Sequence, residues 1–233
     1  MIVLGVDFET TGLDVQKDRI IETGAVLWDT NIGKPLVINS RFCYAEDLPV
    51  IAPDAAAVHG LTVDFLARYA VAHNTALTEI NSMASRAEAF VGHNCMQFDK
   101  PLYLAECERA QTGFYDLPWI DTCCDLKYPQ HIKTRSLMYL AAEHGFLNPF
   151  AHRAVFDVLT MLSIFQKYDL VAALAYAQEP LVTLRACVSY DDRQKAKDRG
   201  YRWTNQHWLK NLRSSEVEAE RRDAGFAVVT FEK

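Results

Sequence analysis

The sequence lacks the long apolar run and the leader pattern that a membrane or secreted protein would carry. No stretch of the 233 residues approaches the roughly 18 consecutive apolar residues of a membrane span. The N-terminus runs into an acidic strand instead of the basic-then-apolar pattern of a signal peptide. Internal repeats and low-complexity segments are also missing. We therefore expect a soluble protein of the cytoplasm with no membrane partner.

Cysteine is present, but not in a metal-binding or redox spacing. The six cysteines contain no C-x-x-C pair, and the adjacent Cys123 and Cys124 cannot easily bridge to each other. We expect reduced, mostly buried cysteines that act as small apolar side chains, and no zinc site.

Charge is distributed unevenly, and the net charge of −6 hides two parts of opposite sign. Residues 1–180 carry 13 Lys and Arg against 22 Asp and Glu, whereas residues 181–233 carry 11 against 8. Half of the residues are hydrophobic, which is enough for one main domain and a small addition. The composition changes after Pro180, so we expect a main domain over 1–178 and a small α+β module over 181–233.

Hydrophobic periodicity predicts an α/β fold. Alternation at the start of the chain predicts an antiparallel meander with strands over 2–9, 19–28 and 36–44. Further on, we expect helices over 53–60, 62–69, 78–89 (with Thr78 as N-cap), 98–107, 136–144 and 154–165, and short strands over 90–94 and 119–122. Strands that alternate with helices after a meander favour a mixed sheet with helices on both faces. In the tail we expect strands over 181–188, 201–209 and 226–231 and helices over 191–199 and 215–223.

The first strand carries two acids in an otherwise apolar segment. Side chains alternate along a strand, so Asp7 and Glu9 point to one face, about 7 Å apart, while Val6 and Phe8 point to the other. Two like charges on a buried strand need a compensating cation, and a hard divalent metal with oxygen ligands provides it. The alternative is an edge strand with two solvated acids. Matching acids further along the chain would favour the metal site over this alternative.

Two more acids further along the chain could join Asp7 and Glu9 at a metal site. Asp99 begins a helix that follows a strand, and Asp157 interrupts an apolar helical stripe, where a carboxylate without a partner is rare. His152 precedes Asp157 by five residues, which places it on the loop before the helix and over the same site. Four carboxylates and a histidine suit two-metal phosphodiester hydrolysis, in which the histidine removes a proton from water near neutral pH.

Four segments of the main domain carry motifs in a fixed order: D-F-E-T-T-G at 7–12, A-V-H-G-L-T at 57–62, H-N-x-x-x-F-D at 93–99 and H-R-A-x-x-D at 152–157. Together they resemble the DEDD superfamily of 3′-5′ exonucleases, in its histidine-containing DEDDh (DnaQ-like) branch. The second segment is similar to one found in bacterial proofreading subunits. The resemblance implies an RNase H-like fold, a mixed sheet flanked by helices.

The resemblance also implies a role for each motif residue. It places two Mg²⁺ (or Mn²⁺) ions among the acids, with Asp7 bridging both. Glu9 and Asp157 would complete the site that activates water, and Asp99 would support the second metal. His152 would be the general base. The residues that would bind the terminal nucleotide are Thr10, Thr11, Gly12, Leu13, His59, Asn94 and Phe98.

The tail resembles a small module that is appended to some nucleic-acid enzymes, through the pattern V-S-Y, A-K-x-x-G-Y-R-W and a second Trp over 188–208. Basic residues interleaved with aromatic ones suggest that the tail binds single-stranded nucleic acid through charge and base stacking. These residues are Arg193, Lys195, Lys197, Arg199, Tyr201, Arg202, Trp203 and Trp208. The alternative is that the two tryptophans form the module's own core and the basic residues a solvated face.

These patterns favour a metal-dependent 3′-5′ exonuclease that removes 5′-mononucleotides from single-stranded or frayed DNA ends. The alternatives are an RNase of the same branch that trims small RNAs, a polymerase proofreading subunit, and a non-catalytic nucleic-acid-binding module. A folded tail favours a standalone enzyme over a proofreading subunit, and the complete set of five catalytic positions argues against the non-catalytic module. The oligomeric state stays open, with a dimer allowed.

Overall fold

Strand β1 (Ile2–Thr10) lies inside a six-stranded sheet with the order β4-β3-β2-β1-β5-β6. The other strands of this sheet are β2 (Ile20–Asp29), β3 (Lys34–Tyr44), β4 (Val71–Ala72), β5 (Ala89–Gly92) and β6 (Trp119–Asp121). The pairs β1–β2 and β2–β3 are antiparallel, whereas β3–β4, β1–β5 and β5–β6 are parallel. The predicted meander and the mixed strand direction are confirmed.

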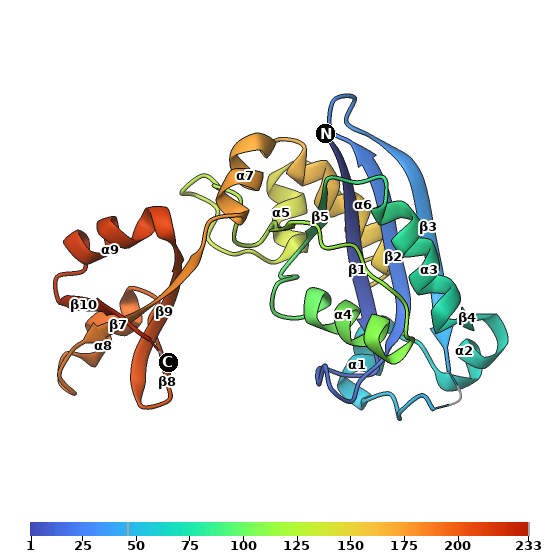
Figure 1. Cartoon of the computed structure of the whole chain (residues 1–233), viewed down its shortest axis with the longest axis horizontal. Helices are drawn as coiled ribbons and strands as arrows, with labels where there is room; N and C mark the ends of the chain where they lie inside the picture. Colours follow the sequence, from blue (N-terminus) through green and yellow to red (C-terminus); the bar gives the residue numbers. More distant parts are fainter. Residues whose placement is uncertain (46, 233) are drawn as a thin grey trace. The chain divides into compact units, whose positions relative to one another are not determined.

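The computed structural model describes residues 1–45 and 47–232, and the chain divides into two compact units, Met1–Ala177 and Gln178–Lys233. The helices of the first unit are α1 (Pro53–His59), α2 (Val63–Tyr69), α3 (His73–Ala84), α4 (Asp99–Arg109), α5 (Leu137–Glu143), α6 (Ala154–Phe165) and α7 (Leu170–Ala177). Helices α3 and α4 cover one face of the sheet, and α6 and α7 cover the other (Figure 1). The first unit therefore has the predicted RNase H-like layout.

Strand β1 sends side chains into both helical layers. Val6 and Phe8 pack in the core beneath α3 and α4, whereas Val3 packs in the core beneath α6. Because side chains alternate along the strand, Asp7 and Glu9 share the face of Val3. The two acids consequently lie on the side of the sheet that α6 covers.

Two glycines let α6 approach the sheet closely beside these acids. Gly24 is the β2 partner of Asp7, and a Cβ at Gly24 would lie 2.4 Å from the carbonyl carbon of Ala154 at the start of α6. A Cβ at Gly5 would lie 2.7 Å from Leu162 Cδ1. Any larger side chain at Gly24 would push the first turn of α6, and with it the third motif, away from Asp7.

The helix expected over 78–89 is wrong in its boundaries. Helix α3 begins five residues earlier, at His73, so Thr78 lies in its middle and is not an N-cap, and β5 already begins at Ala89. A tertiary contact fixes the true start, since the His73 ring bonds the carbonyl oxygen of Ile20 on β2 at 2.6 Å. A local capping pattern cannot reveal such a contact.

Helix α7 was not predicted from the sequence. It follows α6 after a short turn and is bent from it by 110°. In the described ranges no single helix is long and apolar enough to cross a membrane, and only this bent pair reaches the length and composition for a span when taken together. Both helices pack on the sheet, through residues such as Val158, Leu162 and Ala173.

The second unit is a four-stranded sheet with the order β10-β7-β9-β8, in which all neighbours are antiparallel. Its elements are β7 (Leu181–Cys187), α8 (Arg193–Asp198), β8 (Arg202–Thr204), β9 (His207–Arg213), the 3-10 helix η1 (Ser214–Glu216), α9 (Val217–Asp223) and β10 (Ala227–Thr230). A separate core of Leu184, Ala186, Ala196, Tyr201 and Val217 joins the helices to one face of this sheet. The predicted α+β composition is confirmed.

The single strand expected over 201–209 is wrong, because the chain turns back within it. Asn205 and Gln206 have φ angles of 51° and 63°, and they form the two-residue connection between β8 and β9. Positive φ at both central residues is the geometry of a type I′ hairpin turn. The usual Asn-Gly signal is absent because Gln stands at the second position.

The cysteines are all free, as expected, but only half of them are buried. Cys43, Cys95 and Cys107 are buried, Cys123 is half-buried, and Cys124 and Cys187 are exposed. The expectation of mostly buried cysteines is therefore only partly correct.

Candidate active site

Three motif residues converge beside β1. A carboxylate oxygen of Glu9, a ring nitrogen of His152 and a carboxylate oxygen of Asp157 all lie within 4.8 Å of one another. Glu9 comes from β1, Asp157 from the first turn of α6, and His152 from the loop before it. Glu9 thus meets two residues that lie 143 and 148 positions further along the chain.

The other two acids complete the cluster. Asp7 is surrounded by like charge: burial raises its pKa well above the usual range, and the charges of Asp99, Asp157 and Glu9 raise it further. Asp99 is the first residue of α4 and is only 5% exposed. Burial raises the pKa of Asp99 to about 7, and burial followed by the charge of Asp157 raises that of Glu9 to about 7. The four acids therefore face one another without enough positive charge to balance them.

His152 owes its position to a strained loop conformation. Its φ angle is 63°, in the left-handed region that most residues avoid, and its side chain is exposed. The backbone N–H of His152 donates to Asp157 Oδ2 at 2.9 Å, which ties the loop to the first turn of α6. This bond holds the imidazole beside the carboxylates.

Arg153 fixes the same loop to the sheet. Its guanidinium forms an ion pair with Glu22, a buried acid on β2, and donates to the carbonyl oxygen of His59 at 3.1 Å. Glu22 has no role that can be seen in the sequence, because an acid in an alternating strand has no visible partner before the fold brings Arg153 to it.

Asp157 is oriented by a second donor that the sequence did not indicate. Asn148 Nδ2 donates to Asp157 Oδ1 at 2.5 Å, and the Asn148 side chain also accepts the N–H of Phe150 at 3.1 Å. Burial raises the pKa of Asp157, whereas the His152 N–H and the Asn148 amide lower it. An asparagine in a loop is common, so nothing in the local sequence indicates that Asn148 orients Asp157.

The turn after β1 is held by its threonines. Thr10 Oγ1 donates to the carbonyl oxygen of Gly12 at 2.6 Å, and Thr11 Oγ1 donates to Asp18 Oδ1 at 2.8 Å. Both threonines are buried, whereas Leu13 is 84% exposed. A Cβ at Gly12 would lie 2.6 Å from the Asp18 carboxylate, so a larger residue here would displace the carboxylate that binds Thr11. The buried threonine hydroxyls therefore shape the turn, and Leu13 is an apolar residue that the turn exposes to solvent.

The remaining motif residues border the cluster. His59 is buried, with Nδ1 accepting from the Leu61 N–H at 3.0 Å and Nε2 donating to the Thr10 carbonyl oxygen at 3.2 Å. Burial lowers the pKa of His59, which suits a neutral ring that joins α1 to the end of β1. Asn94 is exposed with a φ of 60°, and Phe98 is half-buried directly before Asp99.

The Asn94 loop is organised by Asp121, which the sequence did not single out. The buried Asp121 carboxylate accepts the N–H groups of Asn94, Met96 and Cys123 at 2.8, 3.3 and 2.9 Å. Ligand atoms of Asp121, Cys123 and Cys124 also lie within 4.8 Å of one another. The sequence did not indicate this group of possible metal ligands, because its cysteines do not have the C-x-x-C spacing.

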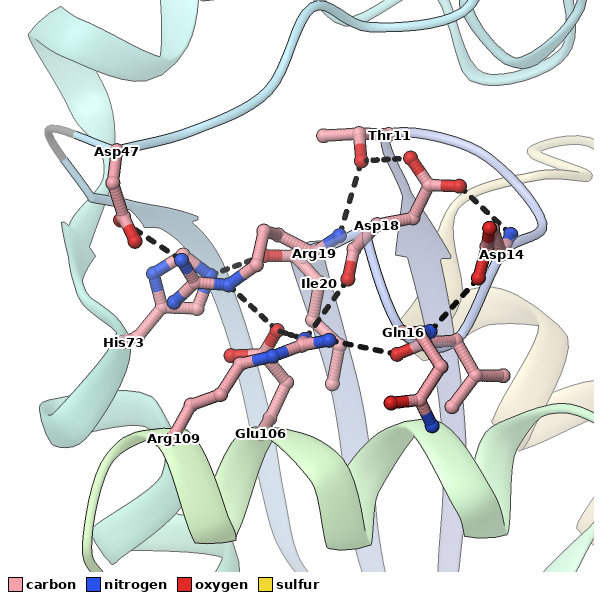
Figure 2. A network of polar contacts seen from close by, with 11 residues as sticks. Thr11, Asp14, Gln16, Asp18, Arg19, Ile20, Asp47, His73, Glu106 and Arg109 are labelled. Atoms are coloured by element: carbon pink, nitrogen blue, oxygen red, sulfur yellow. Dashed lines mark hydrogen bonds and ion pairs between the residues drawn. The ribbon is translucent and has the colours of Figure 1, made fainter.

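A polar network joins the β1 turn to α4 (Figure 2). Glu106 is fully buried on α4, and its carboxylate accepts hydrogen bonds from Arg19 Nε and Arg109 Nη1 at 2.8 Å each. Arg109 also donates to the carbonyl oxygens of Val15 and Asp18, at 2.8 and 3.0 Å. Because Asp99 begins α4, this network fixes the turn carrying Leu13 to the helix that carries a catalytic candidate.

We expect Glu106→Gln to destabilise the protein by about 3 kcal/mol, because the change removes the buried carboxylate that pairs with Arg109 and leaves Arg19 with only the exposed Asp47 as a counter-charge. For a chain of this size the loss corresponds to a fall in melting temperature of roughly 6–12 °C. Calorimetry of Glu106→Gln against Glu108→Gln, an exposed neighbour on the same helix, measures it. Equal melting temperatures for the two variants would show that the network does not stabilise the fold.

The donor set fits hard divalent ions. Carboxylate oxygens are the ligands that Mg²⁺ and Mn²⁺ prefer, and the mutual repulsion of the four acids is the state that a cation relieves. Asp7, Glu9, Asp99 and Asp157 are the residues that would hold such ions.

The raised pKa values give a stability prediction for the metal-free protein. Glu9 and Asp99 have folded pKa values of about 7, above those of the unfolded chain, so both carboxyls take up protons on folding. The stability that protonation provides is lost as the pH rises through about 7. We expect the melting temperature in EDTA to fall by several degrees between about pH 5.5 and pH 8. Saturating Mg²⁺ should remove this fall, and an unchanged pH profile with the metal would contradict the assignment.

Comparison with known proteins defines the class. The Exonuclease family (RNase_T) matches residues 4–165, more than half of the chain, and the chain therefore belongs to this exonuclease family. A domain family of unknown function (DUF8626) matches residues 182–229 of the second unit. No curated protein matches the sequence.

Solved structures show the same fold in Exonuclease I. The Escherichia coli enzyme in complex with a dA16 oligonucleotide is 15% identical, with a TM-score of 0.64 over 80% of this chain and 48% of that chain. Exonuclease I from Methylocaldum szegediense is also 15% identical, with a TM-score of 0.65 over 91% of this chain and 62% of that one. This chain thus spans about half the length of the E. coli enzyme. The predicted exonuclease-type domain is confirmed at the level of family and fold.

Proposed function

We propose that the protein is a metal-dependent 3′-5′ exonuclease that removes 5′-mononucleotides from single-stranded DNA. The observation that carries the proposal is the meeting of Glu9, His152 and Asp157 within 4.8 Å, beside the half-buried Asp7 and the buried Asp99. Four carboxylates and a histidine gathered around Asp7 are groups that suit phosphodiester hydrolysis.

Each group of the chain has a distinct task in this reaction. Two divalent ions held by the four acids would supply Lewis acidity and favour deprotonation of the attacking water. His152 accepts the proton of that water at a ring nitrogen, because its ring is exposed and lies beside Glu9 and Asp157. The Asn148 amide and the His152 N–H keep Asp157 in position while the proton moves.

The residues around the acids suit a terminal nucleotide of any sequence. Leu13 and Asn94 are exposed at the ends of β1 and β5, and Phe98 is half-buried before Asp99. An aromatic ring and an apolar side chain can support any base by stacking, without reading its edge. Exonuclease I, which has the same fold, has been solved with single-stranded DNA oligonucleotides such as dA16 and dT13. This fold-level likeness favours DNA as the substrate.

Product ladders test the proposal. The purified protein is incubated with Mg²⁺ and matched 5′-labelled single-stranded DNA and RNA, with EDTA and Asp7→Asn as controls. We expect a ladder that shortens by one nucleotide from the 3′ end, faster on DNA, and absent in both controls. Faster shortening of the RNA would move the substrate to the RNase alternative. No ladder from a folded protein on either strand would refute the exonuclease.

A further inference from the structure

The strands of the second unit carry positive charge and no acid. Among their described residues β7, β8, β9 and β10 contain no Asp or Glu, whereas they contain Arg185, Arg202, Lys210 and Arg213. The acids of this unit, such as Glu216, lie on its helices, turns and ends. The sheet is thus electropositive relative to the helices that cover it.

One face of this sheet is covered by its own helices. Leu184 pairs with Lys210, and Ala186 pairs with Trp208, so these four side chains share a face. That face packs in the core with α8 and α9, and Lys210 reaches Glu220 of α9 at 3.1 Å. The alternate residues of each strand therefore lie on the opposite face, which we call the open face.

Two arginines lie in one row across the open face. Arg185 on β7 is the partner of Leu209 on β9, and Leu209 is in turn the partner of Arg202 on β8. Two strand spacings separate the arginines, about 10 Å. Arg202 is exposed and Arg185 half-buried, and neither forms an ion pair with any described residue. Their charge is therefore available to a partner.

Polar and aromatic side chains flank this row. Thr183 pairs with Asn211 on one side of it, and Thr204 pairs with His207 on the other. The rings of His207 and Phe231 lie 5.2 Å apart. Free guanidinium groups beside polar side chains and aromatic rings are the combination that binds single-stranded nucleic acid without sequence preference.

The open face differs from the nucleic-acid surface that the tail sequence suggested. Tyr201 is buried, Arg199 is paired with Glu220, and Trp208 packs against the core. Trp203 is 61% exposed, but it pairs with Trp208 and so lies on the helix-covered side. Of the residues chosen from the sequence, only Arg202 lies on the open face.

We propose that the open face of this sheet binds single-stranded DNA, with Arg185 and Arg202 contacting phosphates. The proposal rests on the proposed function for its choice of DNA, and it adds a binding site outside the catalytic unit. Its physical basis is charge complementarity, because a polyanion gains from two unpaired arginines on a sheet whose strands hold no acid.

Binding of a fluorescent 5′-labelled poly(dT) oligonucleotide to the full chain tests this, with anisotropy measured in EDTA to stop hydrolysis. We expect the double variant Arg185→Gln/Arg202→Gln to bind at least about tenfold more weakly at low salt. The slope of log affinity against log salt should shrink by about 1.4, the value for two lost single-strand phosphate contacts. The matched control is Lys195→Gln/Lys197→Gln on exposed α8, with the same loss of charge, and it should stay within about twofold of wild type.

Further measurements separate a loss of DNA binding from a loss of folding or of catalysis. Thermal melting of both double variants shows that the sheet is folded, and single-turnover hydrolysis at saturating DNA shows that the catalytic unit is intact. Equal losses in the two double variants would mean a diffuse charge effect and would overturn the site. A larger loss from Trp203→Ala than from the arginine pair would also overturn it, by placing DNA on the other face. If the arginine pair alone weakens binding while the wild type hydrolyses nothing, the open-face proposal stands and the exonuclease fails.

Discussion

Asp7→Asn should lower the rate of nucleotide release by about a thousandfold or more while the protein stays folded. Asp7 lies at the centre of the acid cluster, where Asp99, Asp157 and Glu9 all contribute to its raised pKa. Electrostatic stabilisation by bound divalent ions is worth several kcal/mol in such reactions, and about 4 kcal/mol corresponds to a thousandfold change in rate. The measurement is single-turnover hydrolysis of labelled DNA with saturating Mg²⁺.

The same change should stabilise the metal-free protein. Asn has nearly the same shape as Asp but carries no charge, so the change removes repulsion from the cluster and preserves packing. We expect a higher melting temperature for Asp7→Asn than for wild type in EDTA, and a smaller increase on addition of Mg²⁺. Asp116→Asn, at an exposed loop position, is the control and should change neither quantity. An Asp7→Asn protein that turns over DNA normally would remove Asp7 from the reaction.

Three of the four candidate acids stand out in the sequence because each of them breaks a local pattern. Asp7 and Glu9 stand on one face of an apolar strand, and Asp157 interrupts the apolar stripe of α6. A charged group in a buried pattern has to be compensated, and that requirement can be seen without coordinates. The loop position of His152 followed from its distance to Asp157 along the chain.

The residues that position these acids could not be predicted in the same way. Asn148, Glu22 and Asp121 are polar residues in ordinary surroundings, and each gains its role only from a partner brought close by the fold. The need for glycine at position 24 could not be predicted either, since it arises only from the close approach of α6 to β2. Sequence patterns report burial and periodicity, whereas these contacts depend on the packing of whole elements.

His152→Asn should reduce turnover by roughly a hundredfold to ten-thousandfold, the usual contribution of a general base. Asparagine is chosen because position 152 has a φ of 63°, and Asn tolerates this conformation better than most residues. The backbone N–H that donates to Asp157 should therefore stay in place. The measurement is single-turnover hydrolysis, with His131→Asn, an exposed histidine in a loop of the same unit, as the control.

A second readout separates two roles that the geometry allows for His152. Its ring nitrogen lies within 4.8 Å of oxygens from Glu9 and Asp157, a distance that suits either a base for water or a metal ligand. A base leaves metal affinity unchanged when it is removed, so the increase in melting temperature with Mg²⁺ should be the same in His152→Asn and in wild type. A ligand would lose part of that increase. We expect the rate to fall with the Mg²⁺ stabilisation intact, because hard ions prefer the four oxygen donors already present and leave the imidazole free to take the proton.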